Sequence, residues 1–198
     1  MATPRRKVVV ARNLGSDVMS LLNNHSELEW PAFVWSPFGF CGPQISANPV
    51  NPKPTAGFIG FGRIAHATLT RLIPFGFARC LYTGNPATPP NADADAKVAE
   101  KYHLEEVRRT DLSELARESD VVFALAPGGS STFHIVDEAF LKQMKKTAVL
   151  VNTGRGTLID SDALAKALQE GWLYGAGLDV VEGEPGITQD HPLVKSPK

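Results

Sequence analysis

The chain has 198 residues, enough for one well-packed core and at most a small second lobe. Its 20 basic and 21 acidic residues give a net charge of -1, which argues against nucleic acid or a membrane surface as the main partner. No apolar run approaches the length that spans a membrane. The two cysteines, Cys41 and Cys80, imply no disulfide framework, so a reducing cytoplasm is the expected compartment. The five histidines are scattered and indicate no metal site.

The first part of the chain predicts one βα unit followed by a linker. The valine-rich run Lys7–Ala11 predicts a strand, and the apolar spacing of Asp17–Leu22 predicts a helix. Between Trp30 and Pro54, six prolines and two glycines interrupt every regular pattern. Such a density of breakers excludes a long helix or a central strand. We therefore predict that residues 31–54 are a proline-rich linker between residues 1–30 and the rest of the chain.

A glycine-rich turn follows this linker. Thr55–Ile59 is a short apolar run, Gly60 and Gly62 are one residue apart, and Ala65 opens an amphipathic stretch. This order of strand, tight turn and helix start has the GxGxxG/A spacing of a dinucleotide site. The first glycine allows the bend, the second lets the main chain approach a pyrophosphate, and the helix N-terminus directs unpaired N–H groups at it. By itself the motif fits a purely structural turn equally well.

Beyond the turn, strand-like and helix-like segments alternate. Helices are predicted at Ile64–Ile73, Ala94–Tyr102, Leu112–Arg117 (with Asp111 as N-cap), Asp137–Met144 and Asp160–Glu170. Strands are predicted at Arg79–Tyr82, Asp120–Ala126, Ala148–Asn152 and Tyr174–Val180, with a loop over residues 84–93. This alternation predicts an α/β fold, a doubly wound parallel sheet of the Rossmann type, over residues 55–186. Ligands bind at the carboxyl ends of the strands in such sheets.

Thr83 follows the second strand of this predicted sheet. An NAD site usually carries an Asp or Glu at about this position, to accept hydrogen bonds from the ribose hydroxyls. Without that acid a 2′-phosphate is not repelled, which favours NADP(H) over NAD(H). No arginine follows directly to bind the phosphate, and the alternative is that Thr83 is an ordinary turn residue.

The three later strand ends carry further candidate residues. The Pro127–Thr132 loop suits a wall beside the nicotinamide ribose, and it is equally an ordinary connection. Arg155 lies between two glycines, where its guanidinium is able to clamp a carboxylate, although an exposed arginine is usually only solvated. The last end contains three carboxylates, which either form a solvated acidic turn or bind a carboxamide and tune a proton donor: Asp179, Glu182 and Glu184.

Four motifs together resemble one known family. They are Gly-Phe-Gly-Arg-Ile-Ala from Gly60, Leu-Ala-Pro from Leu125, Val-Asn-Thr-Gly-Arg-Gly-Thr-Leu-Ile-Asp from Val151 and Gly-Leu-Asp-Val-Val-Glu-Gly-Glu-Pro from Gly177. In this order they resemble the D-isomer-specific 2-hydroxyacid dehydrogenases. Leu81–Gly84 is most similar to the glyoxylate/hydroxypyruvate reductase branch. The resemblance implies hydride transfer between NADPH and a small 2-keto acid, and a homodimer.

The resemblance also implies a role for individual residues. Arg155 would bind the keto acid and polarise its carbonyl, and Glu184 would keep a catalytic histidine protonated. No residue is implied to bind a metal. Cofactor contacts are implied at Gly60, Gly62, Arg63, Ile64, Thr83, Pro127, Thr132, Thr153, Gly154 and Asp179.

The same resemblance implies that parts of the family enzyme lie outside this sequence. The family histidine follows the motif at Asp190–Leu193, beyond Lys198, and His191 belongs to the motif itself. Residues 1–30 would be a remnant of the substrate domain and residues 187–198 a truncated return segment, so we expect negligible reductase activity. Two alternatives stay open: an inactive or cofactor-sensing NAD(P)-binding module, and another Rossmann enzyme such as a methyltransferase, in which Arg155 would have no role.

Overall fold

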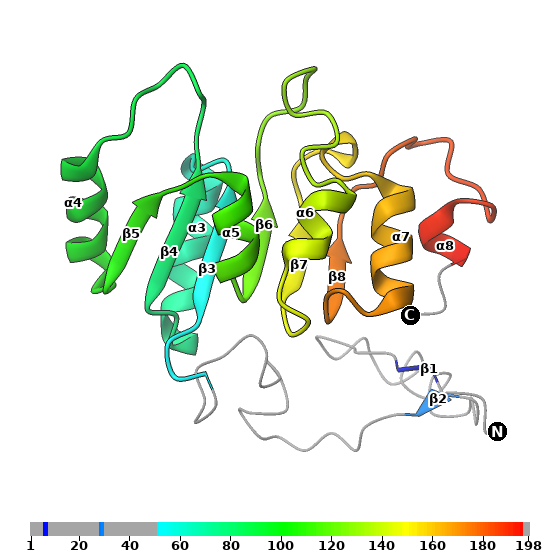
Figure 1. The fold of residues 1–198 in the computed structure, drawn as a ribbon, viewed down its shortest axis with the longest axis horizontal. Helices are drawn as coiled ribbons and strands as arrows, with labels where there is room; N and C mark the ends of the chain where they lie inside the picture. Colours follow the sequence, from blue (N-terminus) through cyan, green and yellow to red (C-terminus); the bar gives the residue numbers. More distant parts are fainter. Residues whose placement is uncertain (1–5, 8–27, 30–50, 196–198) are drawn as a thin grey trace, which may run out of the picture. The chain divides into compact units, whose positions relative to one another are not determined.

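A computed structural model describes residues 6–7, 28–29 and 51–195 of the chain (Figure 1). The chain divides into two units, one of residues 1–40 together with Lys198 and the other of residues 41–197. Among the helices of the described residues, none combines the length and the apolar composition needed to cross a bilayer.

The first unit contains two short strands. β1 (Arg6–Lys7) and β2 (Leu28–Glu29) pair in parallel, with Arg6 opposite Leu28. The predicted strand at Lys7–Ala11 shares only Lys7 with β1. The remainder of that strand and the predicted helix Asp17–Leu22 lie outside the described residues.

The second unit is built on a six-stranded parallel sheet with the strand order β5-β4-β3-β6-β7-β8. The order reverses direction beside β3, as in dinucleotide-binding folds, and this confirms the predicted doubly wound sheet. The strands are β3 (Thr55–Ile59), β4 (Arg79–Thr83), β5 (Glu106–Arg109), β6 (Val121–Ala124), β7 (Val149–Asn152) and β8 (Gly175–Leu178).

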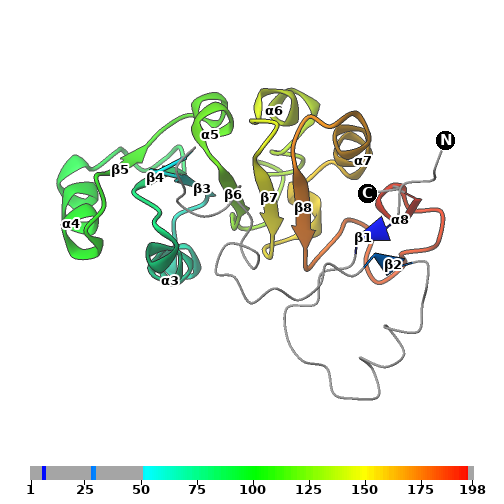
Figure 2. The same cartoon turned by 90° about the horizontal axis from the view of Figure 1, so that it is seen from below.

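Helices cover both faces of this sheet. In Figure 2, α5, α6 and α7 lie over one face and α3 lies under the other. Three helices begin at an aspartate whose carboxylate accepts a backbone N–H three residues on, and one of these confirms the predicted N-cap at Asp111. The helices are α3 (Arg63–Leu72), α4 (Ala92–Tyr102), α5 (Leu112–Glu118), α6 (Glu138–Gln143), α7 (Ser161–Glu170) and α8 (Pro192–Lys195), with 3₁₀ helices at Ile73–Phe75 and Gly156–Leu158.

The apolar core lies on both faces of the central strand. Every residue of β3 is buried, because side chains of α3 pack on one face and side chains of α5 on the other. Phe58 and Leu69 are fully buried on the α3 side, and Leu150 and Leu164 are fully buried on the α7 side. Full burial of each such side chain stabilises the fold by roughly 1.5–3 kcal/mol. The core therefore holds β3, and the turn that follows it, in a fixed position.

The main difference from the predicted elements is β5. Its sequence, Glu-Val-Arg-Arg, has one apolar side chain, Val107, and only that residue is buried. β5 is an edge strand whose charged residues bond to neighbouring elements, so no apolar run marks it. Smaller differences occur at the ends of elements: α4 starts at Ala92, within the predicted loop, because Asn91 caps it, and β6 ends at Ala124 instead of Ala126.

Candidate functional site

The glycine turn after β3 lies at the point where the strand order reverses. Gly60 has a φ of +91°, and a Cβ atom there would lie 2.9 Å from both Cα and N of Ala126. Only glycine allows this backbone to pack so closely on the segment after β6. The Gly60 N–H donates to the carbonyl oxygen of Thr83 at 3.1 Å. The turn is thus joined to both neighbouring strand ends, where open α/β sheets form their ligand crevice.

The next residues form an open cradle at the start of α3. Outside the adjoining residues, no atom of the described part of the chain lies within 4 Å of a Cβ built on Gly62, and Arg63 and Ile64 are exposed. Gly62 caps α3 without a side-chain hydrogen bond, and the first turn contains no acidic residue. The free N–H groups and the helix dipole there favour an anion. These features fit the pyrophosphate of a dinucleotide.

The end of β4 forms one wall beside this cradle. Thr83 is half-exposed, and the ring of Tyr82 stacks on Phe61 of the glycine turn with a centroid distance of 4.3 Å. The Tyr82 hydroxyl donates to Oδ1 of Asp95 at 2.7 Å. Burial, and then this hydrogen bond to Asp95, raise the pKa of Tyr82. Tyr82 therefore remains a neutral hydrogen-bond donor that anchors α4 to the sheet.

A buried amide shapes the turn that carries Arg155. Oδ1 of Asn152 accepts the N–H of Gly154 at 3.0 Å, and Nδ2 donates to the carbonyl oxygen of Arg155 at 2.9 Å. Asn152 is 1% exposed, so these bonds satisfy a side chain that has little access to water. Sequence reasoning did not select Asn152 as a site residue, although it ends an apolar strand and is polar. Thr153 beside it is exposed.

The Arg155 turn packs against the loop after β6. A Cβ on Gly128 would lie 3.2 Å from Cγ of Arg155, so the two segments touch. Thr132 Oγ1 donates to the carbonyl oxygen of Pro127 at 2.7 Å and closes this loop on itself. The Arg155 guanidinium is exposed and donates to the carbonyl oxygen of Gly154 at 2.8 Å. No carboxylate of the described residues pairs with it, so its charge is available to an anion.

The same turn also packs against the backbone after β8. A Cβ on Gly156 would lie 2.2 Å from the carbonyl carbon and oxygen of Val181. The Asp179 N–H donates to the carbonyl oxygen of Asn152 at 2.9 Å, and its side chain is exposed. Glu184 accepts the N–H of Val181 at 3.2 Å. Hence the structure brings the ends of β6, β7 and β8 together, as the parallel sheet predicts.

His134 lies among these candidate residues, and sequence reasoning did not select it. Its Nε2 lies 2.8 Å from Oε2 of Glu182, its Nδ1 lies 3.8 Å from Oδ2 of Asp160, and its backbone N–H donates to Thr157. The residue has a φ of +50°, in the left-handed region, and the ring stacks on exposed Phe133. This side chain joins the loops after β6 and β8. A lone histidine between two apolar residues carries no motif that would have revealed this.

Comparison with known families decides the identity of this fold. Residues 42–198 match the family model described as the NAD-binding domain of D-isomer-specific 2-hydroxyacid dehydrogenases. The chain belongs to this family. The match confirms the resemblance inferred from the motifs, and a domain of this kind binds a nicotinamide dinucleotide. The glycine turn that begins at Gly60 lies within the part of the chain that this family model matches.

Individual relatives of this dehydrogenase domain agree with the family assignment, and those described below are glyoxylate reductases. The glyoxylate reductase of Thermofilum pendens is 37% identical over 161 residues, covering 81% of this chain and 42% of the relative. That of Thermococcus gammatolerans is 41% identical over 164 residues, covering 82% and 44%. The crystal structure of a glyoxylate reductase from Paecilomyes thermophila superimposes with a TM-score of 0.58 at 32% identity, covering 71% of this chain and 39% of that one. The chain spans less than half the length of these relatives.

Proposed function

We propose that this domain binds NADP(H) and belongs to an enzyme that transfers hydride between this cofactor and a small 2-keto acid such as glyoxylate. The observation that carries the proposal is that the ends of β6, β7 and β8 meet beside the Gly60 turn. Arg155, after β7, pairs with no carboxylate of the described residues. The names of the glyoxylate reductases among the relatives support the substrate class. The absence of an acid at Thr83 supports the phosphorylated cofactor.

The cofactor residues divide between the two halves of the sheet. Gly60, Gly62, Arg63 and Ile64 would surround the pyrophosphate, and Thr83 would lie near the adenosine ribose. Pro127 and Thr132 would flank the nicotinamide ribose. The carboxamide would be held at the ends of β7 and β8, by Thr153, Gly154 and Asp179.

The reaction needs a hydride at the carbonyl carbon and a proton at the carbonyl oxygen. The bound cofactor supplies the hydride chemistry. Arg155 would hold the substrate carboxylate with two parallel N–H bonds and polarise the carbonyl, so that the developing negative charge on oxygen is stabilised. We assign to Glu184 the pairing with a protonated histidine of the whole enzyme, which donates the proton.

The remaining assignments belong to the same proposal. We assign residues 1–30 to a substrate domain, residues 31–54 to a linker and residues 187–198 to a return segment, with residues 55–186 as the cofactor domain. Family resemblance supports these boundaries, a cytoplasmic location and a homodimer.

A second candidate function is dinucleotide binding without turnover. It is favoured by Glu184, which within the described residues accepts a hydrogen bond from Val181 and contacts no histidine. The histidine that does pair with a carboxylate of this segment is His134, and its partner is Glu182.

Calorimetric titration of the 198-residue chain with NADPH and NADH tests both candidates. We expect both to bind, NADPH more tightly. Arg155→Met is expected to leave the dissociation constants within about twofold, because Arg155 is assigned to the keto acid. If neither NADPH nor NADH binds, the proposal is contradicted. Glyoxylate-dependent oxidation of NADPH that Arg155→Met abolishes would establish turnover, and binding without oxidation would favour the second candidate.

A further inference from the structure

Two consecutive arginines end β5, and they make different contacts. Successive side chains of a strand point to opposite faces. Nε of Arg108 lies 2.8 Å from Oε1 of Glu106, and its Nη2 lies 2.9 Å from Oε1 of Glu114. No carboxylate of the described residues pairs with Arg109. The two side chains have the same charge, but only that of Arg108 is neutralised by its neighbours.

Arg109 lies at the carboxyl edge of the sheet, against the segment that follows β4. It pairs with Tyr82 in the strand register. Its guanidinium donates to the carbonyl oxygen of Asn85 at 2.8 Å and to that of Thr88. A Cβ on Gly84 would lie 3.2 Å from Cζ of Arg109 and 3.3 Å from Nε. Because residue 84 has no side chain, the guanidinium packs closely on the backbone directly after Thr83.

This position is joined to the cofactor turn by one hydrogen bond. The Thr83 carbonyl oxygen accepts the Gly60 N–H at 3.1 Å, and Gly84, next in sequence, is the residue that Arg109 touches. Thr83 occupies the place where an acid contacts the ribose hydroxyls in NAD sites. The structure therefore puts a cation beside the ribose position. The sequence alone does not indicate that Arg109 lies beside this segment, because Arg109 comes 24 residues after Asn85 and on another strand.

We propose that Arg109 binds the 2′-phosphate of NADP(H) and is the residue that determines cofactor preference. This inference rests on the proposed cofactor function. The two loop carbonyls use two of the five N–H groups of the guanidinium, so three remain for phosphate oxygens. Asp95, on α4 at the same end of the sheet, accepts a hydrogen bond from Tyr82 and does not pair with Arg109. A phosphate would therefore displace no carboxylate.

The loop contacts also orient the cation. With both Nη atoms bonded to the 85–88 segment, the guanidinium has a fixed plane before any ligand arrives. A planar, preorganised fork matches a phosphate and loses little rotamer freedom on binding. A lysine at this position would supply the charge without the fork.

The test compares dinucleotide affinities of the full chain and two variants by calorimetry. For the unsubstituted chain we expect NADPH to bind about 10–100-fold more tightly than NADH, the range for a charge-assisted hydrogen bond to phosphate. Arg109→Gln should lower the affinity for NADPH and leave that for NADH unchanged, so that the two dinucleotides bind about equally. Arg71→Gln is the matched control, since Arg71 donates to the Ala67 carbonyl of its own helix and pairs with no carboxylate of the described residues; it should leave the ratio unchanged.

Adenosine 2′,5′-bisphosphate and adenosine 5′-monophosphate probe the same contact without the nicotinamide. The bisphosphate should bind about 10-fold or more tightly than the monophosphate, and Arg109→Lys should keep part of that difference. This comparison decides the matter if Arg109→Gln does not fold, which circular dichroism would show. A difference below about twofold in the unsubstituted chain would overturn the proposal.

The other outcomes separate this inference from the proposed function. If the unsubstituted chain binds NADPH and NADH equally, Arg109 is not the determinant and the cofactor site stands. If Arg109→Gln lowers the affinities for NADPH and NADH by the same factor, the residue only holds the 85–88 segment and the proposal is wrong. If neither dinucleotide binds, the proposed function and this inference fall together.

Discussion

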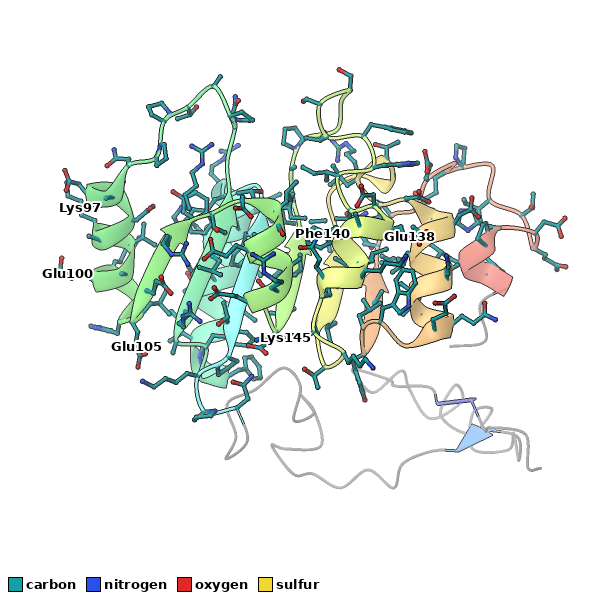
Figure 3. The ribbon with its side chains drawn as sticks, in the orientation of Figure 1. Lys97, Glu100, Glu105, Glu138, Phe140 and Lys145 are labelled. Carbon is teal, nitrogen blue, oxygen red and sulfur yellow. The ribbon has the colours of Figure 1, made fainter. Side chains whose placement is uncertain are left out.

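The two edges of the parallel sheet use positive charge differently. At the amino edge, Arg79 binds Glu106 through Nε at 2.8 Å and Glu118 through Nη2 at 2.8 Å. Lys145 binds Asp120 there at 2.8 Å. Figure 3 shows Lys145 at this lower edge of the sheet. Each of these cations is matched by a carboxylate from a different element.

At the carboxyl edge three arginines, unlike Arg108, lack such partners among the described residues. Their bonds, where they have any, go to backbone carbonyl oxygens, and no carboxylate of the described residues pairs with Arg63, Arg109 or Arg155. Each also lies beside a glycine: Arg63 follows Gly62, Arg109 packs on Gly84, and Arg155 lies between Gly154 and Gly156. Two carboxylates at this edge, Asp160 and Glu182, lie beside His134 instead.

The contrast indicates what each edge does. A matched ion pair between elements holds them together, whereas a cation without a carboxylate partner is free to attract an anionic ligand. Substitutions at the amino edge should therefore change stability and leave cofactor affinity alone. Substitutions at the carboxyl edge should do the reverse.

Asp120→Ala should have the largest effect, and it acts on stability. Asp120 is 5% exposed and accepts bonds from the Thr55 N–H and from Lys145, both at 2.8 Å. Its loss leaves a buried N–H unsatisfied and an ion pair broken, so the free energy of unfolding should fall by about 3 kcal/mol in a urea titration. Glu105→Gln, at the exposed Lys53 pair of the same edge, should cost about 0.5 kcal/mol or less. A loss of NADPH affinity without a loss of stability would contradict the comparison.

Thr83→Asp should act on affinity with little effect on stability. A carboxylate beside Gly84 would repel a 2′-phosphate and accept bonds from ribose hydroxyls, so the NADPH to NADH preference should shift about 10-fold or more toward NADH. In Thr83→Asn the side chain has the shape of aspartate without its charge, so this variant should shift the NADPH to NADH preference much less. Calorimetry with both dinucleotides measures the ratio, and an equal shift for Asn and Asp would rule out charge as the cause.

Acid should destabilise the fold through the ion pairs of β5, the smallest of the three effects. The Arg108 guanidinium, and then Arg79, lower the pKa of Glu106, and Arg108 lowers the pKa of Glu114 from 4.5 to about 2. Because the folded pKa values are depressed, this stabilisation is complete above about pH 4.5 and is lost as the pH falls toward about 2.

Urea titrations between pH 7 and pH 3 measure that loss. Glu114→Gln should reduce the dependence on pH, since it removes one of the groups that titrates differently in the two states. Glu100→Gln is the control, because Glu100 is exposed on α4 and forms no ion pair with the described residues (Figure 3). Identical pH profiles for the unsubstituted chain and Glu114→Gln would show that the Arg108 pairing contributes nothing.

Local patterns predicted most of the cofactor domain. Apolar strands, capped helices and the Gly60 turn each leave a signal within about ten residues, and the order of motifs indicated the family. The strand at Glu106–Arg109 left none, because its stability comes from partners on other elements. Sequence reasoning did not select Arg109 or His134 for the same reason. Their contacts join residues far apart in sequence, so no local pattern predicts them.

The complete burial of β3 also bears on how the domain folds. One of its partners, β4, follows soon after, but the other, β6, comes much later, and the bond from the Thr55 N–H to Asp120 spans 65 residues. Non-local parallel pairings form slowly, because the closure of a long loop precedes them. During synthesis β3 therefore emerges with one edge unpaired and stays so until β6 has been made. In that interval the most completely buried strand of the sheet is open to other chains, and a chaperone that shields it should increase the yield of folded protein.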